Sequence, residues 1–334
     1  CAAPGGKSCE IASRLTGEGV LIANDIEASR ARILSENIER FGLDNTIVTN
    51  VDPMRFTKQF QEAFDKIVLD APCSGEGMFR KLEQAVDTWS EEKVLECAHI
   101  QKNLLKGAYE MLKQGGMVIY STCTYSYEEN EAMVHYAVDE LGFELLPLNK
   151  SHGLCPGVDL DEVVRCYPHH YRGEGHFIAL LRKPGNSPRK AVRPMKPQVS
   201  QANLKVLKAF YQENLNKNVP SYIIENNGHL YAIKKNFPEL KGIRVLRNGL
   251  YLGEVRKNRF IPSYSLALTL TKEDVKRSYD YPSDSAEIKK YIHGETLEGT
   301  GNKGFGVLFV DGYPLSFYKE SNQVKNLFPK GLRR

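Results

Sequence analysis

The sequence is poor in the features that mark secreted, membrane-spanning or disordered chains. Its seven cysteines are odd in number and scattered over 334 residues, which argues against a disulfide framework and favours a reducing compartment. No stretch approaches the roughly 18 uninterrupted apolar residues of a membrane span, and no charged-then-apolar leader opens the chain. With 41% hydrophobic and 26% charged residues, the composition predicts a soluble, cytoplasmic protein of two or three domains.

Common nucleotide and metal motifs are also missing. The chain has neither the GxxxxGK[ST] phosphate loop nor the GxGxxG dinucleotide fingerprint, so neither nucleotide hydrolysis nor hydride transfer gains support. One group of cysteines and histidines lies near a single loop, but its spacing matches no standard pair of zinc-ligand turns, and we expect no metal. That group is Cys155, Cys166, His169 and His170. Cys9 and Cys97 fall within or near helical patterns and are interpreted as small core residues.

Charge is unevenly distributed along the chain. The whole-chain net charge is +4, and counting Lys and Arg against Asp and Glu gives −9 for residues 1–184 and +13 for residues 185–334. A basic surface commonly binds phosphate backbones, although many basic surfaces only keep a protein soluble. The asymmetry favours a nucleic-acid contact in the second half.

The first half has an alternating pattern of strands and helices. Residues 1–184 alternate short β-branched strands with longer amphipathic helices, which is typical of a mostly parallel sheet covered on both faces. Ser126 followed by Glu129 suggests a capping box for the third helix. The pattern predicts an α/β fold with a doubly wound, Rossmann-like sheet. The predicted strands are 19–26, 46–52, 64–72, 116–124 and 176–183, and the predicted helices are 27–41, 90–113 and 127–141.

The second half differs in pattern. Residues 185–200 are rich in Pro and cations and poor in apolar periodicity, as expected of a linker. One helical pattern follows at 201–216, and then come short alternating strands such as 221–226 and 303–319, with Gly, Asn and Asp between them. The downstream part is therefore predicted to be mostly β.

Acidic residues end three successive predicted strands: Asp25, Asp52 and Asp70. Because ligands of an open α/β sheet bind at the carboxyl ends of its strands, the first acid suits a ribose diol and the second an adenine edge. Strand-end Asp is also a common helix cap, and this alternative stays open for each one. The opening CAAPGGKS places Gly5 and Gly6 where backbone can pass close to a ligand, just before a helix N-terminus that favours a carboxylate or phosphate.

Two cysteines follow predicted strand ends beside the same crevice: Cys73 in DAPCSGEG and Cys123 in STCT. C5 of cytosine is too weakly nucleophilic to take a methyl group directly. An enzyme can add a thiolate to C6, transfer the methyl to the electron-rich C5, remove the C5 proton and eliminate the thiol. This scheme needs a nucleophile, an acid near N3 and a base or release group, for which Cys123, Asp70 and Cys73 are candidates.

Five segments occur in one order across almost the whole chain: CAAPGGK, ANDIEASR, DAPCSGEGMFRK, STCTYSYEENE and KNLFPKGLR. Together they resemble the Sun-type (NOP/Sun) family of RNA cytosine-C5 methyltransferases. The tail is similar to the bacterial RsmF-like subgroup, which acts on 16S rRNA and carries a PUA-like RNA-binding module. The resemblance implies S-adenosyl-L-methionine as cofactor and ribosomal RNA as partner, free or in an assembled or assembling small subunit. We further expect a monomer that binds no membrane.

The resemblance also assigns roles to residues. It implies that Cys123 attacks C6, that Cys73 assists proton removal and product release, and that Asp70 holds the cytosine edge. The opening loop would hold the methionine part of the cofactor, with Asp25 at the ribose and Asp52 near the adenine. The implied cofactor-binding residues are Cys1, Ala2, Ala3, Pro4, Gly5, Gly6, Lys7, Asp25, Arg30, Asp52 and Asp70.

The same resemblance suggests a division into domains. A catalytic domain at 1–184 would be followed by a basic linker at 185–200, an intermediate segment at 201–262 and a PUA-like RNA-binding domain at 263–334. Family members have an N-terminal RNA-binding region and a first sheet strand before the CAAPGGK loop. We therefore expect the first strand to be absent from this chain and the full protein to be longer.

Three other interpretations stay open. Cys73 could be the nucleophile, as the PC cysteine is in DNA 5-methylcytosine enzymes. The chain could instead be a non-catalytic RNA-binding factor for ribosome assembly, although a scaffold needs neither cysteine. A small-molecule methyltransferase is the weakest alternative, because a small substrate would have no use for the basic second half.

Overall fold

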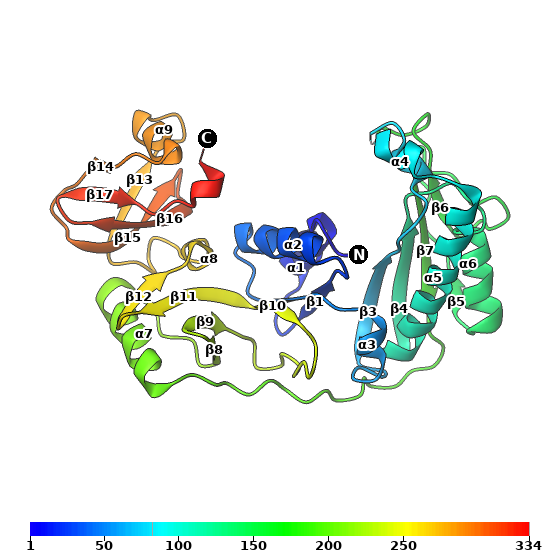
Figure 1. Ribbon diagram of the computed structural model, residues 1–334, viewed down its shortest axis with the longest axis horizontal. Coiled ribbons are helices and arrows are strands. Elements are labelled where there is room, and N and C mark those ends of the chain that lie inside the picture. The colour runs from blue at the N-terminus through cyan, green and yellow to red at the C-terminus, as the bar shows by residue number, and fades with distance from the viewer. Residues whose placement is uncertain (82, 334) are drawn as a thin grey trace. The chain divides into compact units, whose positions relative to one another are not determined.

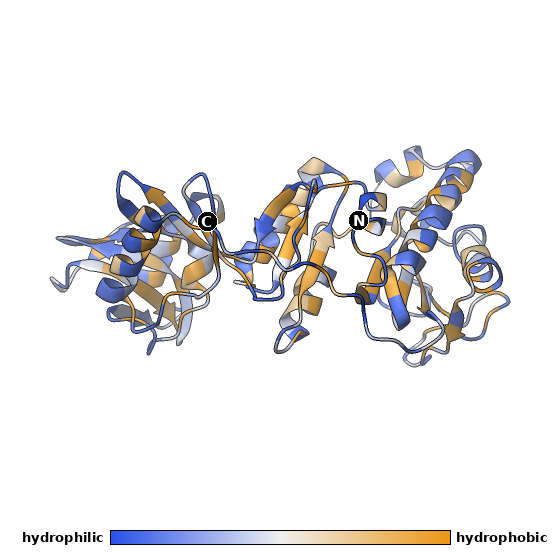
Figure 2. Ribbon diagram, turned by 90° about the horizontal axis from the view of Figure 1, so that it is seen from below, coloured by the Kyte–Doolittle hydropathy of each residue, from blue (hydrophilic) through white to orange (hydrophobic). Residues whose placement is uncertain are grey.

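The computed structural model of the chain describes residues 1–81 and 83–333 (Figure 1). Helices and strands alternate through its first half and strands dominate its second half, which confirms the predicted α/β class with a mostly β downstream part. Figure 2 shows hydrophobic residues concentrated in the strands and hydrophilic residues in many of the loops. Within the described residues, none of the helices combines the length and apolar character that a membrane span requires.

The described chain forms two compact units. The first, here called the cysteine unit, comprises residues 51–193 together with Cys1. The second, here called the discontinuous unit, comprises residues 2–50 and 194–334. The predicted strands of the first half are therefore shared between the two units, with two in the discontinuous unit and three in the cysteine unit.

The cysteine unit is built on a five-stranded mixed sheet. Its strands are β3 (Phe64–Asp70), β4 (Leu112–Thr122), β5 (Glu144–Leu146), β6 (Val164–Cys166) and β7 (His176–Arg182). β3 and β4 are parallel, and β7 pairs antiparallel with β4, β5 and β6. The sheet thus confirms the three predicted strands in this part of the chain and adds two short ones.

The main helix of the cysteine unit is α5 (Glu91–Met111), which confirms the helix predicted at 90–113. It begins at Ser90, whose Oγ accepts the backbone N–H of Lys93 at 3.1 Å, as an N-cap residue does. Its apolar face, including Leu105, packs against Val118 of β4 in the core of this unit. The shorter helices are α3 (Met54–Thr57), the 3₁₀ turn η1 (Glu76–Met78), α4 (Glu83–Asp87) and α6 (Glu131–His135), which continues as the π-helical turn η2 (Tyr136–Glu140).

The third predicted helix, 127–141, begins later than the sequence suggests, because α6 starts at Glu131. The predicted capping box of Ser126 and Glu129 is wrong. Glu129 is completely buried, and its carboxylate binds side chains from distant segments of the chain. Ser126 Oγ does donate to Glu129 Oε1 at 3.4 Å, but a capping box needs both side chains to accept from backbone N–H groups at the helix start, and the N-cap position of α6 is Asn130.

The discontinuous unit contains a three-stranded sheet. Two of its strands come from the start of the chain, and the third comes from the second half of the sequence, which was not predicted. β1 (Leu21–Asn24) and β2 (Thr46–Thr49) are parallel and are connected by α2 (Ala28–Arg40). The far edge of β2 pairs antiparallel with β10 (Val245–Asn248) from the basic half of the sequence. Arg247 of β10 is buried and forms an ion pair of 2.7 Å with Glu39 of α2, which stabilises this pairing. Among the described strands, β1 pairs only with β2, and β3 pairs only with β4.

Two further sheets complete the discontinuous unit. One has the strand order β12-β11-β9-β8 and the other β13-β15-β16-β17-β14. Leu207 and Phe210 of α7 pack with Leu252 and Phe317 from both sheets in one core. The strands are β8 (Ile223–Asn226), β9 (His229–Ala232), β11 (Leu250–Arg256), β12 (Arg259–Pro262), β13 (Ser278–Tyr281), β14 (Leu297–Glu298), β15 (Gly304–Val310), β16 (Tyr313–Glu320) and β17 (Gln323–Asn326). The helices are α1 (Gly6–Arg14), α7 (Gln201–Asn214), α8 (Tyr264–Ala267), α9 (Ala286–His293) and the 3₁₀ turn η3 (Lys330–Leu332).

Candidate functional site

The two predicted catalytic cysteines lie next to each other in the cysteine unit. β3 and β4 are parallel neighbours, and Asp70 at the end of β3 is in register with Ser121 near the end of β4. The segments that leave these strands therefore start side by side. The Sγ atoms of Cys73 and Cys123 are 3.3 Å apart, and the backbone N–H of Cys123 donates to Cys73 Sγ, also at 3.3 Å. The two thiols form one chemical site.

The neighbouring sulfur changes the acidity of Cys73. Its pKa is raised well above the ordinary value, first by the hydrogen bond with Cys123, then by burial and by the charge that Cys123 carries when ionised. Two thiols in contact cannot both ionise readily, because the second negative charge would face the first at short range. Once one thiol of the pair ionises, the other therefore keeps its proton, and a protonated Cys73 can donate to a Cys123 thiolate.

Asp70 lies at the same edge of the sheet. Its Oδ1 accepts a hydrogen bond of 3.0 Å from Ser121 Oγ, which fixes the carboxylate at the strand end. The structure thus brings the three predicted catalytic residues, Asp70, Cys73 and Cys123, to the ends of two adjacent parallel strands. Ligands of α/β sheets bind at this edge.

Gly77 allows the segments around the two cysteines to approach each other closely. Its N–H donates to the carbonyl of Cys123 at 2.9 Å, and its own carbonyl accepts the N–H of Gly175 at 3.2 Å. A Cβ at Gly77 would lie 2.6 Å from the carbonyl oxygen of Gly175 and 2.8 Å from that of Cys123. Both distances are shorter than carbon and oxygen tolerate, and both partners are backbone atoms, so the segments would have to separate.

Replacing Gly77 by Ala is expected to lower kcat about 100-fold, because displacing a reactive group by about 1 Å costs about that factor. Initial rates of methyl transfer to RNA, measured with the full-length protein, test this. Gly331→Ala is the matched control, since a Cβ there meets nothing within 4 Å. Equal rates for the two variants would contradict the close approach at Gly77.

Glu129 joins the segment around Cys73 to the segment after Cys123. Its carboxylate accepts hydrogen bonds from the Oγ and the N–H of Ser74, the residue after Cys73. It also accepts from Nε2 of Gln101 on α5 at 2.8 Å, and the same Nε2 bonds the carbonyl of Pro72 at 2.8 Å. Burial raises the pKa of Glu129, while its bonds from Ser74 and Gln101 act in the opposite direction. Each of these partners donates a hydrogen bond to Glu129, and these bonds favour its ionised carboxylate.

Glu76 makes a second connection between the same segments. Its Oε2 accepts from Thr124 Oγ1 at 3.0 Å and from the N–H of Tyr125 at 2.9 Å. Its Oε1 accepts from the indole N–H of Trp89 at 2.8 Å. Trp89 is 38% exposed and contacts Glu76 through its polar indole N–H group. The position of Cys123 relative to Cys73 is thus set from both sides.

Three consecutive residues, Glu129, Asn130 and Glu131, are all completely buried. Glu129 holds the segment after β3, as described above. Asn130 binds the end of β4, where its Oδ1 accepts from Thr122 Oγ1 at 2.6 Å and its Nδ2 donates to the carbonyl of Thr124 at 3.0 Å. Each member of this triplet therefore contacts a different part of the site.

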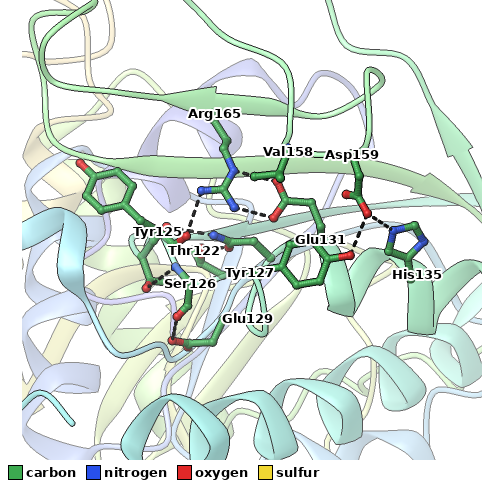
Figure 3. Close-up of polar contacts among 12 residues, drawn as sticks. Thr122, Tyr125, Ser126, Tyr127, Glu129, Glu131, His135, Val158, Asp159 and Arg165 are labelled. Carbon is green, nitrogen blue, oxygen red and sulfur yellow. Dashed lines mark hydrogen bonds and ion pairs between the residues drawn. The ribbon is translucent and has the colours of Figure 1, made fainter. Parts of the chain in front are cut away.

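Glu131 faces Arg165 of β6 in a buried ion pair (Figure 3). The side chain of Arg165 is 3% exposed, and its Nε donates to Glu131 Oε1 at 2.7 Å. Its Nη1 donates to the carbonyl of Tyr125 at 3.0 Å, and Glu131 Oε1 also accepts the N–H of Val158 at 2.9 Å. The pair therefore connects β6 and the loop before it to the segment that follows Cys123.

The buried triplet and Arg165 were missed by sequence reasoning. In STCTYSYEENE the sequence pattern places Glu129 in a capping box and gives no role to Asn130 and Glu131, and charged side chains are seldom buried without a partner. The partners are Ser74, Gln101 and Arg165, which are distant in sequence. The one available signal was that the polar residues extend unbroken beyond the cysteine motif.

The opening loop is held within the discontinuous unit by Asp25, which is 1% exposed. Asp25 Oδ2 accepts the N–H of Ala3 at 3.1 Å, and its Oδ1 accepts the N–H of Glu27 at 3.1 Å. Arg30 Nη2 donates to the carbonyl of Ala3 at 3.0 Å and lies 3.8 Å from Asp25 Oδ2. Asp25 and Arg30 thus position the loop backbone, and their predicted contacts with a cofactor stay predictions.

The loop leads into an uncapped helix N-terminus. α1 begins at Gly6, preceded by Gly5 with φ of 116°, and no side chain caps this end. A Cβ at Gly5 would lie 2.9 Å from Leu34 Cδ1, whereas one at Gly6 would meet nothing within 4 Å. An open helix N-terminus without an acidic residue in its first turn suits a carboxylate ligand. These residues fit the amino-acid part of S-adenosylmethionine.

The predicted cofactor residues are divided between the two units. Ala2 to Lys7, Asp25 and Arg30 belong to the discontinuous unit, whereas Cys1 and Asp52 belong to the cysteine unit. Asp52 Oδ1 accepts the N–H of Met54 at 2.9 Å, a contact of the helix-cap kind that the sequence left open.

The remaining cysteines fall outside this chemistry. Cys9 packs in a core with Leu34, and Cys97 is buried on α5, where burial raises its pKa to about 11. Within residues 1–81 and 83–333, no three His, Cys, Asp or Glu side chains are grouped so that they could hold a metal ion.

Family models match the chain over most of its length. Residues 1–182 match the model described as 16S rRNA methyltransferase RsmB/F. Residues 209–270 match the first C-terminal domain of the RsmF rRNA methyltransferase, and residues 278–334 match the PUA domain of methyltransferase RsmF.

Individual proteins give the same result. The ribosomal RNA small subunit methyltransferase F of Vibrio vulnificus is 35% identical over 349 residues, which cover 100% of this chain and 73% of the relative. The protein of the same name from Aeromonas salmonicida is 31% identical, over 100% of this chain and 72% of the relative. The crystal structure of NSun6 from Pyrococcus horikoshii with SFG, an S-adenosylmethionine analogue, is similar with 36% identity and a TM-score of 0.50. That match covers 56% of this chain and 47% of the NSun6 chain.

Proposed function

Because the chain belongs to the 16S rRNA methyltransferase RsmB/F family, whose members depend on S-adenosylmethionine, we propose that it methylates C5 of a cytosine in 16S rRNA. The observation that carries this proposal is the contact of 3.3 Å between Cys73 and Cys123 beyond two adjacent parallel strands. C5 methylation needs one group that adds to C6 and another that removes the C5 proton. Two thiols in contact, of which one can ionise while the other stays protonated, suit these two roles.

The first step is addition of the Cys123 thiolate to C6. The sulfur–carbon bond forms as the C5=C6 electron pair shifts into the ring, and Asp70 holds the N3 edge of the base. Cys73, whose raised pKa keeps it protonated, stabilises the thiolate before the attack by donating a hydrogen bond. Bound S-adenosylmethionine supplies the electrophilic methyl group that C5 then takes.

The second step is release, in which Cys73 acts as base. Bond formation to C6 removes the negative charge from the Cys123 sulfur and weakens its hydrogen bond with Cys73, so two of the causes that raise the pKa of Cys73 diminish. Cys73 then loses its proton to water and takes the proton from C5. The C5–H electrons restore the C5=C6 bond, Cys123 leaves as a thiolate, and one proton is released per methyl group transferred.

Cofactor binding is proposed for the opening loop and the acids named above. The uncapped N-terminus of α1 would bind the carboxylate of S-adenosylmethionine, and Gly5 and Gly6 let its backbone come close. Asp25 and Asp52 would take the ribose and the adenine.

The proposal extends to the arrangement of the whole chain. The catalytic domain comprises 1–184, and the basic linker 185–200 and the segment 201–262 connect it to an RNA-binding module at 263–334. The protein acts in the cytoplasm as a monomer, on free 16S rRNA or on the small subunit.

A tritium-release assay tests the reaction. The full-length protein is incubated with S-adenosylmethionine and 16S rRNA that carries tritium at C5 of its cytosines. We expect one tritium released to water for each methyl group incorporated, because the C5 proton must leave. Methyl incorporation without tritium release would place the methyl group elsewhere and overturn the proposal.

A non-catalytic role in ribosome assembly predicts a different result. Such a protein would bind 16S rRNA and leave the methyl-group content of the RNA unchanged. The contacts of Glu129 and Glu76, which hold the two cysteines together, favour the catalytic proposal, because a scaffold gains nothing from two thiols in contact.

A further inference from the structure

Four aromatic rings form a row of successive ring contacts that begins two residues after Cys123. We call it the aromatic ladder; its members are Tyr125, Tyr167, His169 and His170. The ring centroids of Tyr125 and Tyr167 are 5.7 Å apart with planes at 20°, and those of Tyr167 and His169 are 5.5 Å apart at 33°. The rings of His169 and His170 follow at 4.1 Å and 48°. The first pair is stacked and the next two are tilted, and the first two separations are typical of interacting aromatic pairs.

The inner end of the ladder is fixed to the catalytic site. The N–H of Tyr125 donates to Glu76 at 2.9 Å. The carbonyl of Tyr125 accepts from Arg165 at 3.0 Å (Figure 3). Its ring lies across Gly175, where a Cβ would be 2.1 Å from the Tyr125 hydroxyl oxygen. Gly175 in turn bonds Gly77, which bonds the carbonyl of Cys123. Two backbone hydrogen bonds, through Gly175 and Gly77, therefore connect the inner end of the ladder to Cys123, the proposed nucleophile.

The outer end is exposed but rigidly built. It lies on a tight turn after β6, where the N–H groups of His170 and Tyr171 both donate to the carbonyl of Tyr167 at 3.0 Å. Gly153 packs against this turn, since a Cβ there would lie 2.4 Å from the carbonyl oxygen of His170. His169 and His170 are both exposed to solvent. Packing in the protein core therefore does not account for their stacking.

We propose that the outer face of the aromatic ladder stacks on an RNA base next to the target cytosine. This inference rests on the proposed function, because it needs an RNA substrate at the Cys123 site. A cytosine that enters an enclosed site leaves its neighbours without one stacking partner, and aromatic side chains replace that partner in RNA recognition. Rings that already contact one another and are held on a tight turn lose little conformational freedom when a base is added.

The double variant His169→Ala and His170→Ala in the full-length protein tests the ladder. We expect the KM for 16S rRNA to rise about tenfold, because one stacked base contributes about 1–3 kcal/mol and 1.4 kcal/mol corresponds to a factor of ten. The kcat at saturating RNA and the KM for S-adenosylmethionine are expected to stay unchanged. An unchanged KM for RNA overturns the proposal.

Two matched double variants separate stacking from charge. Phe at both positions keeps the ring faces and removes the titratable nitrogens, and it is expected to restore the KM for RNA to within about twofold of the unmodified protein. Lys at both positions supplies a positive charge without a ring and is expected to behave like Ala. Restoration by Lys and not by Phe would show a phosphate contact and overturn the stacking proposal.

The outcome is distinguishable from failure of the proposed function. If the chain is not a C5 methyltransferase, the unmodified protein releases no tritium, and the ladder loses its premise. If only the stacking proposal is wrong, the unmodified protein releases tritium and the Ala double variant has an unchanged KM for RNA. Equal thermal midpoints of the unmodified and variant proteins confirm that the exposed substitutions leave the fold intact.

Discussion

A full-length protein with Cys73→Ala is expected to accumulate as a covalent complex with 16S rRNA, whereas Cys123→Ala forms no complex and transfers no methyl group. The thiolate of Cys123 still adds to C6 when Cys73 is absent, because the attacking atom is retained. The C5 proton then has no base, so release slows by about 10²–10⁴, the usual contribution of a positioned acid or base. Denaturing gel electrophoresis with labelled RNA measures the complex directly.

Cys155→Ala is the matched control for this experiment. Cys155 is a free, partly exposed cysteine in the same unit, and its side chain is placed in no proposed catalytic step. The Cys155→Ala variant should methylate 16S rRNA at the rate of the unmodified protein and should accumulate no covalent complex. A complex that accumulates with Cys123→Ala and not with Cys73→Ala would exchange the two roles and make Cys73 the nucleophile.

Arg165→Ala is expected to lower the free energy of unfolding by about 3–5 kcal/mol, because it leaves a buried carboxylate without its partner. Glu131 is completely buried and accepts two hydrogen bonds from Arg165, so its carboxylate loses both donors and its counter-charge at once. Denaturant-induced unfolding of the full-length protein measures the change. Methyl transfer should fall as well, because Arg165 also holds the carbonyl of Tyr125.

Arg182→Ala provides the comparison on the same sheet. Arg182 on β7 pairs with Glu144 at 2.6 Å, but both side chains are about half exposed, 47% and 45%. A surface pair of this kind contributes about 0–1 kcal/mol. If the two arginine variants unfold at the same denaturant concentration, the buried pair does not hold the site together. Replacing both Glu131 and Arg165 by Met should recover part of the loss, because an apolar pair leaves no charge uncompensated.

The position of the two cysteines could be predicted from sequence because it depends on local patterns. Strands end where apolar alternation ends, and parallel neighbours end at the same edge of a sheet. Cys73 and Cys123 were therefore expected to be close, and their sulfur atoms lie in contact. What the pattern could not supply was the contact itself, in which the two sulfur atoms share a hydrogen bond and raise the pKa of Cys73.

Pairings between distant segments were not predictable in the same way. β10 pairs with β2 although about 200 residues separate them, roughly the span between Thr49 and Val245 in register. Hydrophobic alternation indicates that a strand exists and says nothing about its neighbour. The buried Arg247 on β10 would have been read as a solvated charge without knowledge of Glu39 on α2.

The same limit explains the capping box that the structure does not form. Ser126 and Glu129 have the spacing of that motif, which is a purely local signal. Ser74 and Gln101 offer Glu129 three donors from distant segments, and a buried carboxylate is stabilised far more by several donors than by one at a helix end. The long-range hydrogen bonds of Glu129 thus outweigh the local capping motif.

The triplet Glu129–Asn130–Glu131 acts in this protein through the order and spacing of its residues. Each of the three side chains leaves the backbone in its own direction and meets a separate partner: Ser74, Thr122 and Arg165, respectively. The same three residues in another order, or shifted by one position, would face the wrong partners all at once. Damage at this point is therefore collective, and single changes here will not add up as independent losses. The triplet connects the segment after Cys73, the end of β4 and strand β6 to one another. The arrangement of the two sulfur atoms therefore depends on contacts across the sheet of the cysteine unit.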